Sequence, residues 1–135
     1  MVNREYAKRF FELNIQYNRM LEQAGTQVIV NGEDAALYWL YTEDKPLFSG
    51  ELSQRMELSS GRVANILNSL EKKGMIVRER NGADRRQVSV RLTEAGRKQI
   101  DSCYQECICW CENMLEKLEQ KDVDTFLDLT EQILR

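Results

Sequence analysis

The stretch from residue 59 to residue 96 reads SSGRVANILNSLEKKGMIVRERNGADRRQVSVRLTEAG. Its first half repeats apolar residues at the i, i+3, i+4 and i+7 spacing of one buried helical stripe. The members of this stripe are Val63, Ile66, Leu67 and Leu70. Ser59 is placed to cap the start of the helix, and Gly74 ends it after Lys73. The sequence therefore predicts a helix from Ser59 to Lys73.

The apolar period then changes from that of a helix to that of a strand. Residues 75–80 and 87–92 are two short segments, and alternate residues of the second face inward and outward. The inward set is Val88, Val90 and Leu92, and the outward set is Gln87, Ser89 and Arg91. The connection between the segments carries the turn signal Asn81-Gly82, which predicts a β-hairpin.

A shorter helix is expected just before this stretch, from Gly50 to Met56, with Ser49 as its N-cap. About three residues join it to the next helix, which fits a helix-turn-helix. A helix-turn-helix followed at once by a β-hairpin is a winged helix. We therefore expect a mainly α (α+β) fold, a winged helix-turn-helix with a two-strand wing, flanked by helices from both ends of the chain.

Amphipathic helices are expected on both sides of this module. The first repeats apolar residues in steps of four and three and ends at Gly25. The flanking helices cover residues 4–24, 93 to about 119, and about 122–134, and a further helix is expected at 34–43. We expect one domain over 1–135, with a winged module at 34–92 and dimerisation helices at 4–24 and 93–134.

The terminal helices carry more apolar surface than one small winged module can cover. This excess predicts a homodimer across a two-fold axis, although the same seam could also pack within one chain. The apolar residues concerned are Phe10, Leu13, Tyr17, Met20, Leu115, Leu118, Leu127 and Ile133.

Composition excludes several classes of protein. The 135 residues contain no histidine, which removes Ser-His-Asp catalysis, Cys-His catalysis and imidazole zinc sites. No apolar run approaches the roughly 18 residues of a membrane span, and no signal peptide is visible. We expect a soluble cytoplasmic protein that is not an enzyme, needs no cofactor and does not contact a membrane.

Positive charge is concentrated in the winged module, although the net charge of the chain is −3. Residues 49–92 hold nine Lys or Arg and five Asp or Glu, an excess of +4, and the remainder holds 10 basic and 17 acidic residues, an excess of −7. A basic patch on an acidic protein fits a nucleic-acid interface, and its coincidence with the winged helix strengthens that interpretation.

The polar side of the helix at 59–73 suits the major groove of double-stranded DNA. Asparagine can bridge the N6 and N7 atoms of adenine, and arginine can bridge O6 and N7 of guanine. A glycine allows close approach, and the helix N-terminus can lie against a phosphate. The candidate residues are Ser60, Gly61, Arg62, Asn65, Asn68 and Lys72. The alternative is an ordinary solvated face.

The hairpin tip carries Arg85 and Arg86 next to Asp84. A basic tip can enter the minor groove, where the phosphate walls concentrate negative potential. Asp84 would pair with an arginine and fix the tip in position. The alternative is a solvated turn with incidental charges.

These residues resemble the MarR family of bacterial winged-helix transcription regulators. The resemblance runs from Leu52-Ser53-Gln54-Arg55-Met56 to the wing, and its most specific part is the Asp-x-Arg tip followed by Leu-Thr-x-x-Gly, residues 84–96. It implies an obligate homodimer on pseudo-palindromic operator DNA, with Arg86 in the minor groove and Asp84 orienting the tip. Gly61, Arg62 and Asn65 depart from the hydroxyl or basic residues that relatives often carry, which leaves the operator sequence open.

Many members of that family respond to small aromatic ligands in a cleft next to the dimer helices, and others respond to oxidants or metals. Tyr38, Trp39, Tyr41 and Phe48 fall in the region that would border such a cleft. Ordinary packing of aromatic side chains in the core is the favoured alternative.

Four cysteines lie within nine residues of the helix that follows Thr93. Helical phase places Cys103, Cys107 and Cys111 on the apolar stripe and Cys109 on the opposite face. Packing as small hydrophobic side chains is favoured, and a disulfide within one helix is not, because i, i+4 Cβ atoms lie about 5–6 Å apart. A thiol redox sensor and a soft-metal site, Zn²⁺ or Cu(I), remain alternatives.

The sequence as a whole predicts a sequence-specific DNA-binding regulator. We expect a repressor that binds its operator as a homodimer and responds to a small ligand. The alternatives are a thiol or soft-metal sensor that uses the cysteines, and a winged helix that serves protein contacts. The last of these would predict an apolar outward face on residues 61–72.

Overall fold

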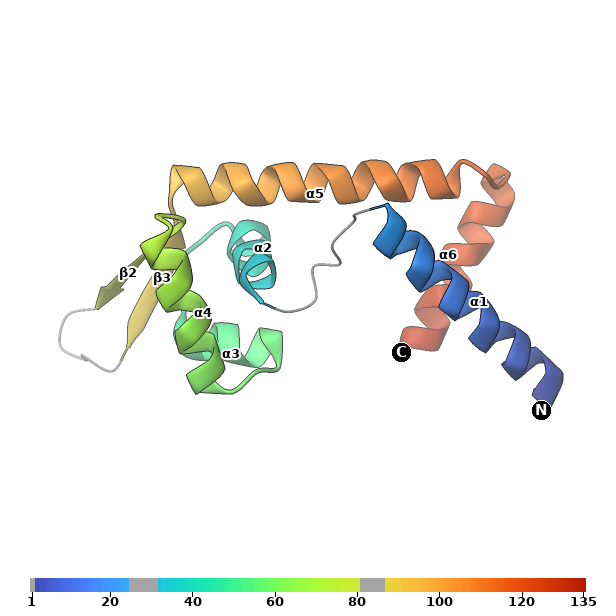
Figure 1. Cartoon of the computed structure of the whole chain (residues 1–135), viewed down its shortest axis with the longest axis horizontal. Helices are drawn as coiled ribbons and strands as arrows, with labels where there is room; N and C mark the ends of the chain where they lie inside the picture. Colours follow the sequence, from blue (N-terminus) through green and yellow to red (C-terminus); the bar gives the residue numbers. More distant parts are fainter. Residues whose placement is uncertain (1, 25–31, 81–86) are drawn as a thin grey trace. The chain divides into compact units, whose positions relative to one another are not determined.

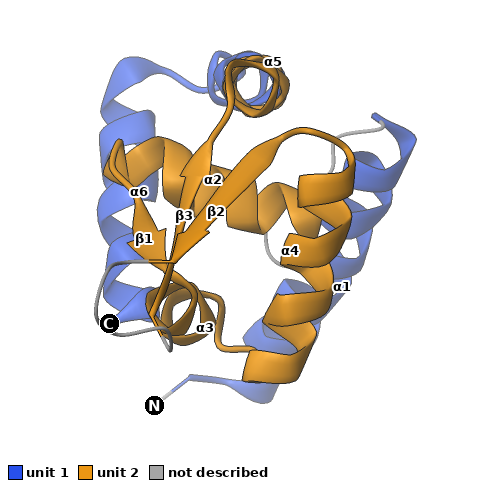
Figure 2. Ribbon diagram, turned by 90° about the vertical axis from the view of Figure 1, so that its left-hand side faces the viewer, with its two compact units in different colours: residues 1–27, 106–135 blue, residues 28–105 orange. Residues whose placement is uncertain are grey.

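The computed structural model describes residues 2–24, 32–80 and 87–135, and the chain forms two compact units (Figures 1 and 2). The larger unit comprises residues 28–105, and the smaller one combines residues 1–27 with residues 106–135. No helix in the described part of the chain is both long enough and apolar enough to cross a membrane.

A small antiparallel sheet organises the larger unit. Its strands are β1 (Leu47–Phe48), β2 (Ile76–Arg80) and β3 (Val88–Leu92), in the order β1-β3-β2. The expected hairpin is present, with Arg80 opposite Val88. Strand β1 adds a third strand to the two expected. Its two residues are too few to show a period, and it exists because Leu47 pairs with Val90.

Four helices contribute to the larger unit: α2 (Glu33–Glu43), α3 (Ser49–Met56), α4 (Ser60–Lys72) and the start of α5 (Glu94–Leu115). The predicted cap of α4 is confirmed, since the Ser59 Oγ accepts a hydrogen bond of 3.2 Å from the Arg62 amide. The predicted cap of α3 is wrong. Phe48 takes that position, and its amide donates to the Glu51 carboxylate at 3.1 Å, so Ser49 is already helical.

Every helix and strand of the larger unit contributes to one apolar core. The predicted stripe of α4 is confirmed, because Val63, Leu67 and Leu70 are buried and Ile66 packs partly buried against them. The buried residues are Ala35, Ala36, Leu37, Leu40, Leu47, Leu52, Met56, Val63, Leu67, Leu70, Ile76, Val90 and Ile100. Burial of this stripe turns the other side of α4 towards solvent.

The start of α5 is fastened to the segment between α4 and β2. The Thr93 amide donates to the Met75 carbonyl at 3.0 Å, and the Thr93 hydroxyl donates to the Gly74 carbonyl at 2.6 Å. The same hydroxyl accepts from the Gly96 amide at 3.1 Å, which makes Thr93 the cap that the sequence predicts. Gly74 adopts a φ of 74°, a conformation that glycine tolerates best.

The smaller unit contains α1 (Arg4–Gln23), the end of α5 and α6 (Gln120–Leu134). No residue of α1 or α6 is buried. Tyr17 of α1 meets Trp110 of α5 edge to face, with ring centroids 5.9 Å apart. Helix α5 ends at Leu115, earlier than the predicted end near Glu119, because Glu119 is extended and serves as the N-cap residue of α6.

Candidate nucleic-acid interface

The polar side of α4 lies on the surface of the larger unit. The six candidate residues of this helix are all exposed, as the helical phase predicts. They are Ser60, Gly61, Arg62, Asn65, Asn68 and Lys72. No heavy atom lies within 4 Å of the place where a Cβ on Gly61 would stand, so the backbone there is open to a ligand. Contact of these residues with DNA stays a prediction.

Ion pairs neutralise part of the positive charge of the winged module. Arg55, Lys73, Arg78 and Arg91 pair with Glu43, Glu33, Glu71 and Glu79, respectively. Within residues 49–92, as far as the structure describes them, Arg62, Lys72 and Arg80 form no ion pair. Between residues 49 and 92, these three side chains are therefore the described cations that a phosphate backbone could neutralise.

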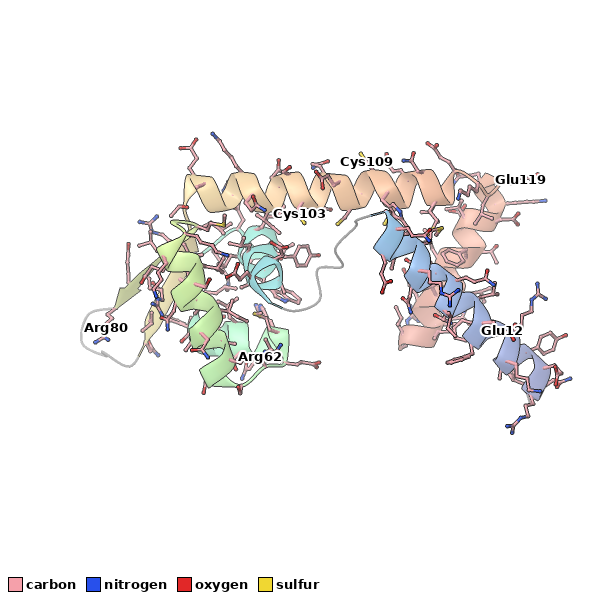
Figure 3. All side chains as sticks on the ribbon, in the orientation of Figure 1. Glu12, Arg62, Arg80, Cys103, Cys109 and Glu119 are labelled. Atoms are coloured by element: carbon pink, nitrogen blue, oxygen red, sulfur yellow. The ribbon has the colours of Figure 1, made fainter. Side chains whose placement is uncertain are left out.

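Arg80 is a candidate that the sequence alone did not single out. It ends β2, on the hairpin, whereas Arg62 lies on the first turn of α4 (Figure 3). A count of charges in the sequence cannot distinguish an arginine that forms an ion pair from one that forms none. Their positions in the structure do distinguish them. Arg78 contacts Asn68 and Glu71 of α4, whereas Arg80, two residues nearer the hairpin tip, forms no such contact.

The amide oxygen of Asn68 already accepts a hydrogen bond within the chain. The Arg78 Nη2 donates to the Asn68 Oδ1 at 2.7 Å, and Arg78 also donates to both carboxylate oxygens of Glu71, at 3.0 and 3.3 Å. The hydrogen bond from Arg78 holds the pKa of Glu71 below its ordinary value, so Glu71 remains a carboxylate. Arg78 therefore already occupies part of the Asn68 amide, and contact of Asn68 with DNA stays a prediction.

A polar hollow of about 440 Å³ adjoins this network. Its lining combines one side of α4 with the facing side of the hairpin. The lining residues are Asn68, Glu71, Arg78, Arg80 and Val88.

The residues predicted for the wing tip, Asp84, Arg85 and Arg86, lie outside the described residues. Their roles stay predictions. The described residues end at Arg80, the last residue of β2, and begin again at Gln87, just before β3.

The aromatic residues of α2 pack partly buried against the core, in agreement with the favoured interpretation. The Tyr41 hydroxyl donates to Asp101 at 2.6 Å, and this bond raises the pKa of Tyr41. The guanidinium of Arg55 lies 5.9 Å from the ring centroid of Trp39. Among the described residues, the Arg55 Nε is the one buried side-chain nitrogen or oxygen without a hydrogen-bond partner.

The cysteines divide differently from the expected pattern. Cys103 and Cys107 are partly buried, while Cys109 and Cys111 are exposed, and Cys103 and Cys109 leave α5 on opposite sides (Figure 3). The prediction that Cys111 packs within an apolar stripe is wrong for the single chain. Helices α1 and α6 bury none of their own residues, so this unit has no core that could enclose the thiol.

Neither disulfides nor metal clusters occur in the part of the chain that the structure describes. All four cysteines lie in that part, and none is joined to another. The same residues contain no group of three or more Cys, Asp or Glu side chains arranged to hold a metal ion.

Comparison with known proteins gives one family. Residues 35–87 match the model described as the MarR family. The uncharacterised HTH-type transcriptional regulator YkoM of Bacillus subtilis is 36% identical over 72 residues, which cover 53% of this chain and 46% of YkoM. The chain spans about half the length of the four curated relatives that are 31–36% identical to it.

Solved structures show the same fold. A MarR family protein from Bacillus stearothermophilus superposes with a TM-score of 0.76 at 23% identity, covering 98% of this chain and 96% of that one. MepR of Staphylococcus aureus in its DNA complex superposes with a TM-score of 0.64 at 20% identity, covering 99% of this chain and 97% of MepR. At these identities the likeness concerns the fold.

Proposed function

We propose that the chain is a homodimeric transcriptional repressor of the MarR family that binds a pseudo-palindromic DNA operator. The observation that carries this proposal is the exposed polar face of α4, which holds open arginine and lysine side chains next to a basic hairpin. An apolar face, as a protein-binding winged helix would need, is not found there. The similar fold of MepR, whose structure was solved in complex with DNA, supports DNA binding as the proposed role.

In this proposal α4 enters the major groove. Arg62 and Asn65 lie in its first two turns, where recognition helices contact base edges. Arg62 would bridge guanine and Asn65 adenine, while Ser60 at the helix N-terminus would lie against a phosphate. Lys72 at the other end of the helix would contact the backbone.

The wing would contact the adjacent minor groove. By the family resemblance, Arg86 would enter that groove with Arg85 beside it, and Asp84 would orient the tip. The narrow minor groove favours arginine because its negative potential is concentrated between the phosphate walls.

Uncovered apolar surface supports the homodimer. Large apolar side chains of α1 and α6, and Leu118 between α5 and α6, remain exposed in the single chain, and exposed apolar patches mark interaction sites. They are Tyr6, Phe10, Phe11, Leu13, Ile15, Tyr17, Met20, Leu118, Phe126, Leu127, Leu129, Ile133 and Leu134. In this proposal residues 4–24 and 93–134 form the dimer, and residues 34–92 bind DNA.

We further propose that a small molecule regulates DNA binding. Partly buried Trp39 and the unsatisfied Arg55 Nε beside it support a ligand that offers an aromatic ring and a hydrogen-bond acceptor. Thiol chemistry is the second candidate, and exposure of Cys109 and Cys111 favours it.

In vitro selection of double-stranded DNA by the full chain tests the DNA-binding proposal. We expect enrichment of a pseudo-palindromic sequence, and Asn65→Ala should relax base preference at one or two positions of each half-site. Lys98→Ala is the matched control, because Lys98 is an exposed cation of α5 outside the winged module. Absence of any enriched sequence would contradict the proposal.

A further inference from the structure

The network between α4 and β2 assigns a role to Asn68 that differs from the role of Asn65. Asn68 and Glu71 lie three residues apart on α4, and Arg78 and Arg80 lie two residues apart on β2. The first spacing places two side chains on one face of a helix, and the second places two on one face of a strand. All four line the polar hollow.

Arg78 determines which amide atom of Asn68 faces the hollow. A guanidinium has only donors, so the atom 2.7 Å from its Nη2 must be the amide oxygen. One lone pair of this oxygen is thereby occupied, whereas both hydrogens of the amide nitrogen have no partner among the described residues. With Arg78 on its oxygen side, Asn68 is oriented to present its two amide hydrogens, which suits a ligand rich in acceptors.

The charge around the hollow is +1. Arg78 and Glu71 neutralise each other through their two hydrogen bonds, whereas Arg80 has no ion pair in the described part of the chain. The hollow therefore combines one uncompensated guanidinium with one amide donor. A backbone phosphate suits both groups, because it is an anion whose oxygens accept hydrogen bonds.

We propose that Asn68 and Arg80 together bind a backbone phosphate of the operator, and that Arg78 is the positioning residue that orients Asn68 for this contact. The inference rests on the proposed DNA-binding function. Asn68 lies in the third turn of α4 and next to the hairpin, beyond the N-terminal turns that contact bases. A phosphate contact fixes the register of the protein on DNA and carries no sequence information directly.

The salt dependence of operator binding tests the contribution of Arg80. Affinity is measured by fluorescence anisotropy between about 50 and 200 mM salt, where log K falls linearly with log salt. We expect Arg80→Ala to reduce this slope by about 1, the loss of one phosphate contact. Arg91→Ala is the matched control, since Arg91 belongs to the same hairpin and pairs with Glu79. An unchanged slope for Arg80→Ala, or equal reductions for both variants, would overturn the assignment.

Base preference tests Asn68. Asn68→Ala should weaken binding roughly tenfold or more, as expected for a hydrogen bond to a charged acceptor, and equally for the operator and its single-base variants. Asn68→Asp should weaken binding further, because a second negative charge would face the phosphate. A shift of base preference in Asn68→Ala would make Asn68 a base-reading residue and refute the proposal.

A double-mutant cycle tests the role of Arg78. Lysine keeps a positive charge near Glu71 but lacks the planar fork that reaches both α4 side chains. Arg78→Lys should therefore weaken binding, and the loss should not add to that of Asn68→Ala, because both changes remove the same contact. Fully additive losses would show that Arg78 does not act through Asn68.

The outcomes separate this inference from the function on which it rests. If the unmodified chain enriches no DNA sequence, the proposed function fails. If it binds a selected operator and the variants behave in any of the contrary ways described, only the phosphate contact fails.

Discussion

Gly96 is the position at which a single methyl group should perturb the fold most clearly. A Cβ at this position would stand 2.0 Å from the Met75 carbonyl oxygen and 2.9 Å from the carbonyl carbon. Ordinary contacts begin at 3.4 Å, so the backbone would have to separate by the difference of roughly 1.4 Å. Neither neighbour is a flexible side-chain end that could rotate away.

Such a displacement would disturb the hydrogen bonds that hold the start of α5 against the segment between α4 and β2. The hydrogen bond between the Thr93 amide and the Met75 carbonyl, 3.0 Å long, would lengthen or break. Overpacking of this kind destabilises by about 1–3 kcal/mol. Gly96 lies in the first turn of α5, so alanine recovers less than the roughly 1 kcal/mol that its higher helix propensity gives in a helix interior. We expect Gly96→Ala to lower the free energy of unfolding by about 1–2 kcal/mol, which lowers the Tm by roughly 4–8 °C in a chain of this size.

Thermal and urea unfolding followed by far-ultraviolet circular dichroism measure this loss. All variants are compared at one protein concentration, because the stability of the proposed dimer would depend on concentration. Gly50→Ala is the matched control, since Gly50 is exposed on α3 and no atom lies within 4 Å of its Cβ position. The control should unfold at or above the Tm of the parent. A Gly96→Ala variant as stable as the parent would refute the reasoning.

Four further predictions concern assembly, DNA, pH and thiols. Sedimentation should show a dimer at micromolar concentration, and a stable monomer would contradict the dimer proposal. Arg86→Ala should weaken operator binding by about 1–3 kcal/mol, and affinities within twofold of each other at matched salt would remove the wing from the interface. Lys73 lowers the pKa of Glu33 through a hydrogen bond, so the pair stabilises the fold fully above the ordinary Glu value of 4.5, and this contribution is lost as the pH falls through the lowered pKa. Because the pair is partly exposed, Glu33→Gln should remove about 0.2–1 kcal/mol at pH 7 and flatten the acid limb of the stability curve, and an unchanged acid limb would show that the pair contributes nothing. Alkylation mapped by mass spectrometry should modify exposed Cys109 and Cys111 before Cys103 and Cys107, and the reverse order would contradict the burial of α5.

Local signals explain what the sequence predicted correctly. The stripe of α4 and the Ser59 and Thr93 caps depend on neighbours within about one or two helical turns. The turn at Gly74 and the alternation around Val90 are equally local. The polar face of α4 followed directly from the stripe, and most of the candidate interface therefore came from the sequence.

Contacts between distant segments explain what the sequence missed. Strand β1 depends on pairing with β3, about forty residues along the chain, and two residues carry no period of their own. Asn68 and Glu71 meet Arg78 only once the hairpin packs on α4, so the sequence could not separate Arg78 from the open Arg80. The exposure of Cys111 depends on which segments cover the end of α5, and helical phase alone does not give that.

The position of β2 at the edge of the sheet also bears on self-association. An edge strand offers unpaired backbone groups to other chains, and charged side chains are one means of preventing such pairing. Three consecutive residues of β2 are charged: Arg78, Glu79 and Arg80. If two copies paired antiparallel about Glu79, the carboxylates would oppose each other and each Arg78 would oppose an Arg80, and like charges directly opposite destabilise a pair of strands. The opposite edge is only two residues long, so the sheet offers little template for growth into fibres while the hairpin is not bound to DNA.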